Sequence, residues 1–208
     1  MKKGKVMYQF ILDESGSMQS CMDPIIKGFN QQLETIQQIQ HEDPTQNNRI
    51  SLLLFNHLIR EVLSDAEVDA CIPLSTTNYS PSGTTALLDA IGTAVDRLSE
   101  ADKDETTNFV VIILTDGYEN ASIRYNYHMI AEKIKSLEAT GRWTFTFLGA
   151  DMDAIHTSKM LNIKSENTIK FSKSYTSGMM DDISDAIKEY SKESKAQKEF
   201  LIKFRSGK

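Results

Sequence analysis

The sequence contains few cysteine and histidine residues, and their spacing excludes several kinds of site. Only two cysteines occur among the 208 residues, Cys21 and Cys71, and they lie too far apart to form a CxxC pair. A disulfide framework or a cysteine-based zinc site is therefore not expected, and we interpret both thiols as reduced. No histidine has an HxxxH or HxxH neighbour, so none is assigned to a metal. The histidines are His41, His57, His128 and His156.

The chain also lacks long apolar runs and an excess of positive charge. No segment approaches the roughly 18 apolar residues of a membrane helix. The basic N-terminus and its short apolar run end at Asp13 without a small-residue cleavage site, which indicates a first strand rather than a signal peptide. We therefore expect a cytoplasmic protein with no membrane partner. The net charge of −6 also makes nucleic acid an unexpected partner, because sequence-independent binding draws on clustered positive charge.

What the sequence does contain is an ordinary globular composition, in which short apolar runs alternate with helical patterns. Hydrophobic residues make up 40% and charged residues 25% of the chain. A chain of 208 residues suffices for one well-buried domain but not for two. We therefore predict a single domain over residues 1–208. The predicted strands cover residues 6–12, 50–55, 59–63, 109–114, 143–148 and 168–171.

The spacing of apolar residues predicts five helices between and after these strands. The first begins at Asp23-Pro24, an N-cap followed by a first-turn proline, and ends at a polar cluster over residues 41–48. The last runs from about residue 178 to 203 and leaves residues 204–208 as a tail. The other three begin near Thr85, cover residues 127–137 before a C-cap at Gly141, and cover residues 153–161.

The order of these elements predicts the sheet. Only a few residues separate the runs 50–55 and 59–63, which is too short for a parallel crossover, so the third strand is expected to be an antiparallel edge. Residues 64–83 contain prolines and polar residues, and we expect them to be irregular. The remaining alternation predicts a parallel sheet with helices on both faces. The fold class is therefore α/β, Rossmann-like and doubly wound, with strand order 3-2-1-4-5-6 and a topological switch point between strands one and four.

A segment rich in oxygen-bearing side chains directly follows the first strand. It reads Asp13-Glu14-Ser15-Gly16-Ser17 and lies at the carboxyl end of the strand, where open α/β sheets bind ligands. Asp13, Ser15 and Ser17 offer only oxygen atoms, which a hard divalent cation such as Mg²⁺ prefers. Two neutral hydroxyls leave such an ion under-neutralised, so it would attract a further carboxylate from outside. A polar turn is the plain alternative, because Asp, Ser and Gly all favour turns.

Two later segments strengthen the metal interpretation. The segment SGTTAL at residues 82–87 places the Thr85 hydroxyl at the start of a helix on the same side of the sheet, although an ordinary Thr N-cap would look alike. Asp116-Gly117 follows the most apolar strand, and an ordinary turn is the alternative there. If strands one and four are neighbours, Asp116 points into the same crevice as Asp13.

Together the three segments resemble the von Willebrand factor A domains, a family that includes the integrin I domains. The hallmark of that family is a metal-ion-dependent adhesion site, written D-x-S-x-S, then Thr, then Asp. The motif maps onto Asp13, Ser15 and Ser17, then Thr85, then Asp116. We choose Thr85 because it directly precedes Ala-Leu, as the family threonine does, whereas Thr84 stands where the family often has a second glycine. The resemblance covers nearly the whole chain.

The resemblance implies a non-enzymatic protein-interaction module. The hydroxyls of the mapped residues would bind Mg²⁺ or Mn²⁺, and the two aspartates would act directly or through water. A Glu or Asp of a protein partner would complete the shell of the ion. The residues expected to form the rim that selects the partner are Glu14, Thr84, Tyr118, Glu119 and Asn120. The chain looks like the stand-alone intracellular members of bacteria and phages, which often work beside AAA-type ATPases or with kinases and phosphatases.

An enzyme is the main alternative. A strand-ending Asp also begins the haloacid-dehalogenase phosphatases and the receiver domains of response regulators, so Asp13 would then transfer or accept a phosphoryl group. Those phosphatases need a second Asp two residues on, where this sequence has Ser15, and receivers need a Lys after the fifth strand, where residues 147–151 contain none. A scaffold with a degenerate, metal-free site is the second alternative, and the five oxygen-bearing side chains argue against it.

Overall fold

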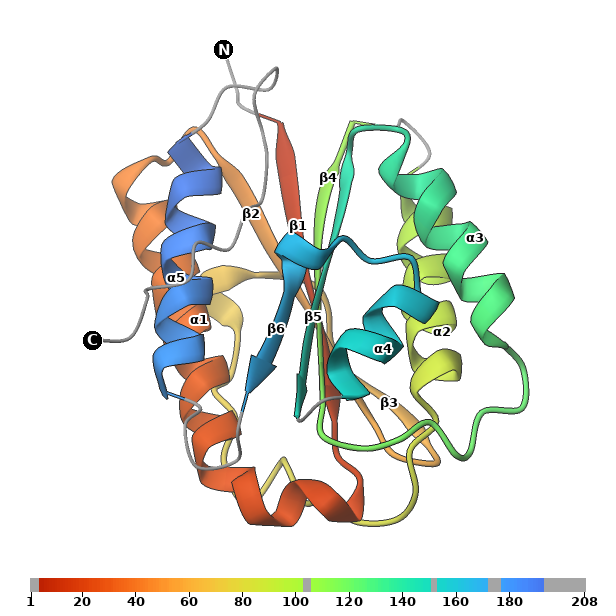
Figure 1. The fold of residues 1–208 in the computed structure, drawn as a ribbon. Helices are drawn as coiled ribbons and strands as arrows, with labels where there is room; N and C mark the ends of the chain where they lie inside the picture. The colour runs from red at the N-terminus through yellow and green to blue at the C-terminus, as the bar shows by residue number, and fades with distance from the viewer. Residues whose placement is uncertain (1–3, 103–105, 151–152, 172–176, 193–208) are drawn as a thin grey trace.

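A six-stranded sheet runs through the centre of the molecule (Figure 1). The structure is a computed structural model that describes residues 4–102, 106–150, 153–171 and 177–192. The strand order β3-β2-β1-β4-β5-β6, with β3 antiparallel to β2 and the other paired strands parallel, confirms the predicted topology. The strands are β1 (Lys5–Asp13), β2 (Asn47–Phe55), β3 (Ile59–Glu67), β4 (Asn108–Thr115), β5 (Trp143–Ala150) and β6 (Thr168–Phe171).

Helices cover both faces of this sheet, as predicted (Figure 1). One face carries α1 (Met22–Glu42) and α5 (Ser177–Lys192), and the other carries α2 (Leu87–Ala101), α3 (Tyr127–Glu138) and α4 (Asp153–Met160). Successive side chains of a strand belong to opposite faces, so β1 contributes Phe10 to the first core and Ile11 to the second. Both layers exclude water from β1, which explains why its sequence is apolar without alternation.

The edge strand β3 is longer than its sequence predicted. It extends to Glu67, past the expected end at residue 63, although its second half is polar. Asp65 has left-handed backbone geometry (φ 44°) and accepts hydrogen bonds from Lys5 at 2.8 Å and from Arg49 at 3.1 Å. A strand at the edge of a sheet can keep charged side chains in water while its backbone pairs on one side. The apolar pattern therefore ends earlier than the strand does.

The helix boundaries mostly agree with the predictions. α1 begins at Met22 rather than Asp23, because the short 3₁₀ helix Gly16–Cys21 leads directly into it. The C-cap of α3 is Ala139 and not Gly141 as predicted, and Gly141 lies two residues later with a positive φ of 71° in the turn that leads to β5. The described part of α5 ends at Lys192, and the predicted continuation to residue 203 and the tail 204–208 lie outside the described residues. Among the helices within the described ranges, none combines the length and apolar character needed to cross a bilayer.

Polar side chains of α1 hold the irregular segment that brings the chain back from β3 to the second predicted ligand loop. Asn30 donates to the carbonyl of Leu74 at 2.9 Å and accepts the Leu74 N–H at 2.8 Å. Gln37 donates to the carbonyl of Val68 at 2.9 Å. Because an irregular segment satisfies only some of its own backbone groups, these side-chain amides replace strand partners at Val68 and Leu74. The segment over residues 68–86 is thereby held in place along its course.

The start of α2 is tied to the loop between β4 and α3 by hydrogen bonds in both directions. Asp89 accepts the backbone N–H groups of residues 123–125, each at 2.9 Å. In return, Glu119 accepts the N–H of Leu88 at 2.9 Å, and Ser122 accepts the N–H of Asp89 at 3.0 Å. The cap residue of α2 makes no side-chain hydrogen bond, so the loop satisfies the first amides of the helix.

Tyr125 packs directly on Gly92 in the middle of α2. A β-carbon at Gly92 would lie within 2.7 Å of three atoms of the Tyr125 ring. Tyr125 is held through its backbone and its side chain. Its backbone N–H donates to Asp89, and its hydroxyl donates to Asp96 at 2.5 Å. The missing side chain of Gly92 therefore permits the close approach of the loop to the helix.

Replacing Gly92 with Ala tests this packing. In a helix interior the change normally stabilises a protein by about 0.5–1 kcal/mol. Here the added methyl group collides with Tyr125, and we expect the free energy of unfolding to fall by roughly 1–3 kcal/mol in urea denaturation. The same substitution in a Tyr125→Ala background should be neutral or stabilising, because the ring is gone. A single variant at least as stable as the wild type would contradict the packing.

Candidate metal centre

Three loops meet at the edge of the sheet where the parallel strands end, which is the lower edge in Figure 1. Residues 13–17 follow β1, residues 82–86 lead into α2, and residues 116–126 follow β4. Leu12 and Leu114 are paired across β1 and β4, so the residues just beyond them are neighbours. A backbone hydrogen bond of 3.0 Å from Gly16 to Gly83 joins the first two loops.

The serines of the first loop lie against the aspartate of the third. The Ser17 hydroxyl donates to Asp116 Oδ1 at 2.5 Å. The Oγ atoms of Ser15 and Ser17 are 3.1 Å apart. Two of the predicted hydroxyl ligands and one predicted carboxylate are therefore in direct contact, although β1 and β4 are far apart in the sequence.

Gly117 shows that the other predicted oxygen ligands face the same space. A β-carbon at this position would lie 2.7 Å from Thr85 Oγ1, 3.3 Å from Asp13 Oδ2 and 3.4 Å from Ser17 Oγ. Three oxygen atoms from two loops thus face one space. This space is open because Gly117 in the third loop has no side chain. Thr85 is buried, with 3% of its surface exposed, whereas Thr84 is exposed. The structure therefore brings all five predicted ligand residues together, with Thr85 as the threonine of the cluster.

Asp13 is the buried centre of the cluster, with 0% of its surface exposed. Thr115 donates to its Oδ2 at 2.6 Å, the backbone N–H of Ser15 donates to its Oδ1 at 2.7 Å, and the Tyr79 hydroxyl donates to its backbone carbonyl at 2.6 Å. Burial raises the pKa of Asp13 to about 6, although the hydrogen bonds from Thr115 and Ser15 lower it. In the metal-free protein the negative charge of Asp13 is poorly stabilised, and a cation in the cluster would offset this.

The donor set fits a hard divalent cation. It consists of hydroxyls and carboxylates, which suit Mg²⁺ and Mn²⁺ better than the nitrogen and sulfur ligands of structural zinc sites would. Across the part of the chain that the structure describes, no three acidic, His or Cys side chains gather into a metal-binding group. A cation here would depend on neutral hydroxyls, so a further carboxylate ligand would strengthen its binding considerably.

The sequence matches the family model of the von Willebrand factor type A domain over residues 9–195. The chain belongs to this family. The match includes the three loops of the cluster and most of the described fold, so the resemblance seen in the motifs is confirmed. Among curated proteins, none matches the chain.

Solved structures share the A-domain fold. The von Willebrand factor domain of the type V pili tip protein Mfa5 from Porphyromonas gingivalis has a TM-score of 0.67 and 10% identity, over 92% of this chain and 98% of that one. Manganese-loaded TRAP protein from Plasmodium vivax has a TM-score of 0.57 and 15% identity, over 84% and 71%. Proximal thread matrix protein 1 from the mussel byssus, with zinc in its MIDAS motif, has 0.58 and 19%, over 89% and 46%. This A domain thus spans about half the length of the mussel protein.

Glu14 does not belong to the rim of this A domain, contrary to the prediction. Its side chain is only 9% exposed, and both of its carboxylate oxygens accept from Arg60, at 2.9 and 3.1 Å. It also accepts the N–H of Ser80 at 2.7 Å, and Arg60 donates to the carbonyl of Asn78 at 3.0 Å. Because the carboxylate is used internally, Glu14 anchors the loop at residues 13–17 to β3 and to the segment that delivers Thr85.

Of the other predicted rim residues, Thr84, Tyr118 and Asn120 are exposed and Glu119 is half-buried, and the last two of the four also hold the loops. Thr84 is exposed, and Tyr118 is 69% exposed. Glu119 accepts hydrogen bonds from its own loop and from the start of α2. Asn120 accepts the Thr85 N–H at 2.9 Å and donates its own N–H to the Thr85 carbonyl at 3.0 Å. The Glu119 side chain therefore holds its own loop against the start of α2, and Asn120 fixes both backbone groups of Thr85.

Sequence reasoning missed three residues that hold the cluster: Thr115, Tyr79 and Arg60. Thr115 carries a usable signal, because it lies at the end of a strand next to Asp116 and can reach the neighbouring strand end. Tyr79 and Arg60 carry none, because their contacts with Asp13 and Glu14 form only when distant segments fold against the first loop.

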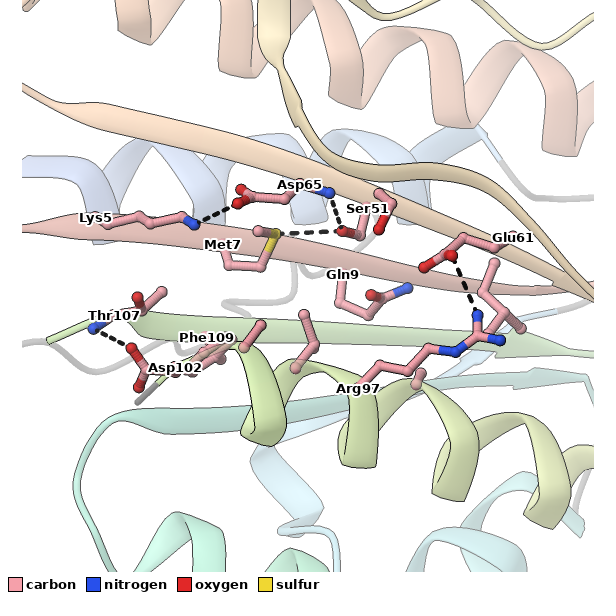
Figure 2. Close-up of a pocket in the computed structure, with 15 residues that line it drawn as sticks. Lys5, Met7, Gln9, Ser51, Glu61, Asp65, Arg97, Asp102, Thr107 and Phe109 are labelled. Carbon is pink, nitrogen blue, oxygen red and sulfur yellow. Dashed lines mark hydrogen bonds and ion pairs between the residues drawn. The ribbon is translucent and has the colours of Figure 1, made fainter. Parts of the chain in front are cut away.

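A separate cavity of about 90 Å³ lies over the other half of the sheet, between α2 and the first three strands (Figure 2). The charged groups drawn at its rim are paired, Lys5 with Asp65 at 2.8 Å and Arg97 with Glu61 at 3.2 Å. Ligand pockets usually measure about 300–1,000 Å³. This cavity is too small for that class of ligand, and we assign none to it.

The charge of Asp13 should make the metal-free domain less stable at neutral pH. Its pKa of about 6 in the folded state exceeds the ordinary value of 3.8, so the folded state binds more protons between these values and stability falls as pH rises through this range. In urea denaturation with EDTA, Asp13→Asn should be more stable than the wild type by on the order of 2 kcal/mol at pH 8, with little difference at pH 4. Added Mn²⁺ should stabilise the wild type only. An Asn variant that is less stable at pH 8 would overturn this account.

The ion pair between Glu14 and Arg60 should support metal binding from outside the ligand set. Arg60→Met leaves the Glu14 carboxylate buried without its cation, and the loop at residues 13–17 loses an anchor. We expect the Mn²⁺ affinity, measured by electron paramagnetic resonance, to fall roughly tenfold. Arg97→Met is the matched control, because Arg97 is 50% exposed against 48% for Arg60 and its partner Glu61 lies in β3. Equal affinities for the two variants would contradict the anchoring role.

Proposed function

We propose that this A domain binds Mg²⁺ or Mn²⁺ at the oxygen cluster and uses the ion to hold an acidic side chain of a protein partner. The observation that carries the proposal is the convergence of oxygen atoms from Thr85, Asp13 and Ser17 on the space beside Gly117. The hydroxyls of Ser15, Ser17 and Thr85 would serve as ligands. Asp13 and Asp116 would supply the negative charge. The domain would then act in binding and not in catalysis.

The exposure of the cluster favours a ligand from outside. Asp13, Ser15 and Thr85 are 0%, 1% and 3% exposed and close the inner side. Ser17 is exposed and Asp116 is half-buried, so the outer side faces solvent. A cation that the hydroxyls hold directly has little negative charge among its ligands if Asp13 and Asp116 act through water. An incoming Glu or Asp would then take a position that water otherwise fills.

Two of the structural neighbours support metal binding in this family fold. One was solved loaded with manganese, and another with zinc in its MIDAS motif. From these two neighbours we infer only that this chain binds a divalent cation, and we do not infer that the cation is manganese or zinc in particular.

Phosphoryl transfer through Asp13 is the second candidate, and the geometry favours it less. Asp13 has no exposed surface, and both of its carboxylate oxygens already accept hydrogen bonds. A nucleophile needs one oxygen free and in line with the phosphorus. The residue two positions on is Ser15, which is no general acid near neutral pH. Incubation with acetyl phosphate followed by mass spectrometry should therefore leave the mass of Asp13 unchanged.

The identity of the partner remains a prediction from the family resemblance. The resemblance predicts that the partner is an AAA-type ATPase or a kinase and phosphatase system. It also predicts a bacterial or phage source and a cytoplasmic location. A partner that supplies Glu or Asp is the one feature for which the cluster itself provides an argument. No nucleic-acid or membrane partner is proposed.

Manganese soaked into crystals tests the metal site directly. We expect an anomalous peak within coordination distance of the Ser15, Ser17 and Thr85 hydroxyls in the wild type. Thr85→Val removes one hydroxyl while nearly preserving volume, and it should abolish or strongly weaken the peak. Thr84→Val is the matched control, because the neighbouring threonine is exposed, and it should retain the peak.

Two results would count against the proposed function. One is the absence of a peak in wild-type crystals whose lattice leaves this edge open, which would favour a metal-free scaffold. The other is a peak of equal height in Thr85→Val, which would place the ion on other ligands.

A further inference from the structure

Exposed apolar side chains gather at the edge of the sheet that carries the oxygen cluster. Seven large apolar side chains are exposed in the described part of the chain. Two of them lie away from this edge: Ile72 follows β3 and its 3₁₀ turn, and Met160 ends α4. The other five lie in loops after strand ends or in the first turn of a helix at the same edge: Leu58, Tyr118, Ile123, Met129 and Ile155.

Two of these side chains belong to the loop that also carries Asp116. Tyr118 is 69% exposed and Ile123 is 91% exposed. Single exposed apolar residues are ordinary on protein surfaces, but a group beside a polar site is typical of an interaction surface. The loop over residues 116–126 therefore joins one predicted ligand of the cation to two apolar side chains that face water.

The backbone of this loop is fixed, so the exposure is not the result of a loose segment. The N–H of Ile123 donates to Asp89 at 2.9 Å, and the next two N–H groups donate to the same carboxylate. Glu119 accepts from the N–H groups of Ala121 and Ser122 at 2.9 and 2.8 Å. Apolar side chains on an ordered backbone lose little entropy when a partner covers them, which is the property of good contact residues.

The charges of the loop favour an acidic partner. The carboxylate of Glu119 is taken up by hydrogen bonds with the loop and α2, and Asp116 accepts from Ser17 inside the cluster. Arg124 is exposed beside Ile123, and its guanidinium lies 5.3 Å from the centre of the Tyr125 ring. The exposed side chains of this loop are apolar, cationic or neutral amides, and none of them is acidic. This surface complements a carboxylate with an apolar neighbour.

We propose that the partner of this A domain is a protein segment that presents a carboxylate to the cation together with an apolar side chain that packs against Tyr118 and Ile123. This inference rests on the proposed function and adds the chemistry of the partner. The carboxylate provides metal dependence, which any acidic segment could share. The apolar contact provides selectivity, because it separates partners that carry the same acidic residue.

A display library of random peptides, each with one fixed glutamate, tests the inference. The library is bound to the full chain in Mn²⁺ and eluted with EDTA, and enriched peptides are synthesised for affinity measurements. We expect an apolar residue at a constant offset from the glutamate. Tyr118→Ser and Ile123→Ser should each weaken the enriched peptides by roughly tenfold or more. Ile72→Ser is the matched control, because Ile72 is 71% exposed away from this edge, and it should leave the affinity unchanged.

The outcomes separate this inference from the proposed function. Enriched peptides that need Mn²⁺ but show no apolar preference, or that bind Ile123→Ser as well as the wild type, overturn the inference and leave the metal-dependent function standing. The absence of any EDTA-eluted peptide counts against both. Sedimentation velocity in Mn²⁺ tests whether a second copy of this chain binds the surface instead of a partner segment. Self-association of the wild type that Ile123→Ser abolishes would replace the partner segment with a second copy of this chain.

Discussion

A buried carboxylate at the point where the two central strands end is the constraint on which the site depends. Asp13 ends β1 and Thr115 ends β4, and one hydrogen bond of 2.6 Å joins their side chains beneath the surface. A carboxylate out of contact with water is costly, and the raised pKa of Asp13 expresses that cost. A cation among the surrounding hydroxyls and the second aspartate would compensate this unfavourable charge, as the proposed function requires.

Around this charge the side chains divide into two groups with different tasks. The carboxylates of Glu14, Asp89 and Glu119 bind arginine or backbone N–H groups, and so hold the loops in position. The neutral hydroxyls of Ser15, Ser17 and Thr85 stand at the cluster. This division would limit the negative charge beside a bound ion, so that an external carboxylate could approach. It also means that the loops are ordered by contacts that involve no metal.

The fold and the convergence of the five candidate ligand residues could be predicted from the sequence because each has a local signature. Central strands such as β4 are covered on both faces and are therefore apolar throughout, and parallel strands end at one edge, which places Asp13 and Asp116 together. The task of Glu14 could not be predicted. It depends on Arg60 in the edge strand and on Ser80, and no pattern within the loop at residues 13–17 indicates either contact. The end of β3 at Glu67 could not be predicted either, because the solvent-facing part of an edge strand needs no apolar residues.

The space beside Gly117 has a consequence for which substitutions this domain can accept during evolution. Oxygen atoms of three candidate ligand residues face the position that the β-carbon of any other residue would occupy at position 117. A codon change from glycine to alanine would insert one methyl group there and leave every ligand residue unaltered. The motif would still read as complete, while the added methyl group would lie 2.7 Å from Thr85 Oγ1, in the space where we propose that the ion binds. For this chain, the five residues of the motif are therefore an incomplete criterion for metal binding, because Gly117, which is not among them, keeps the space beside them open.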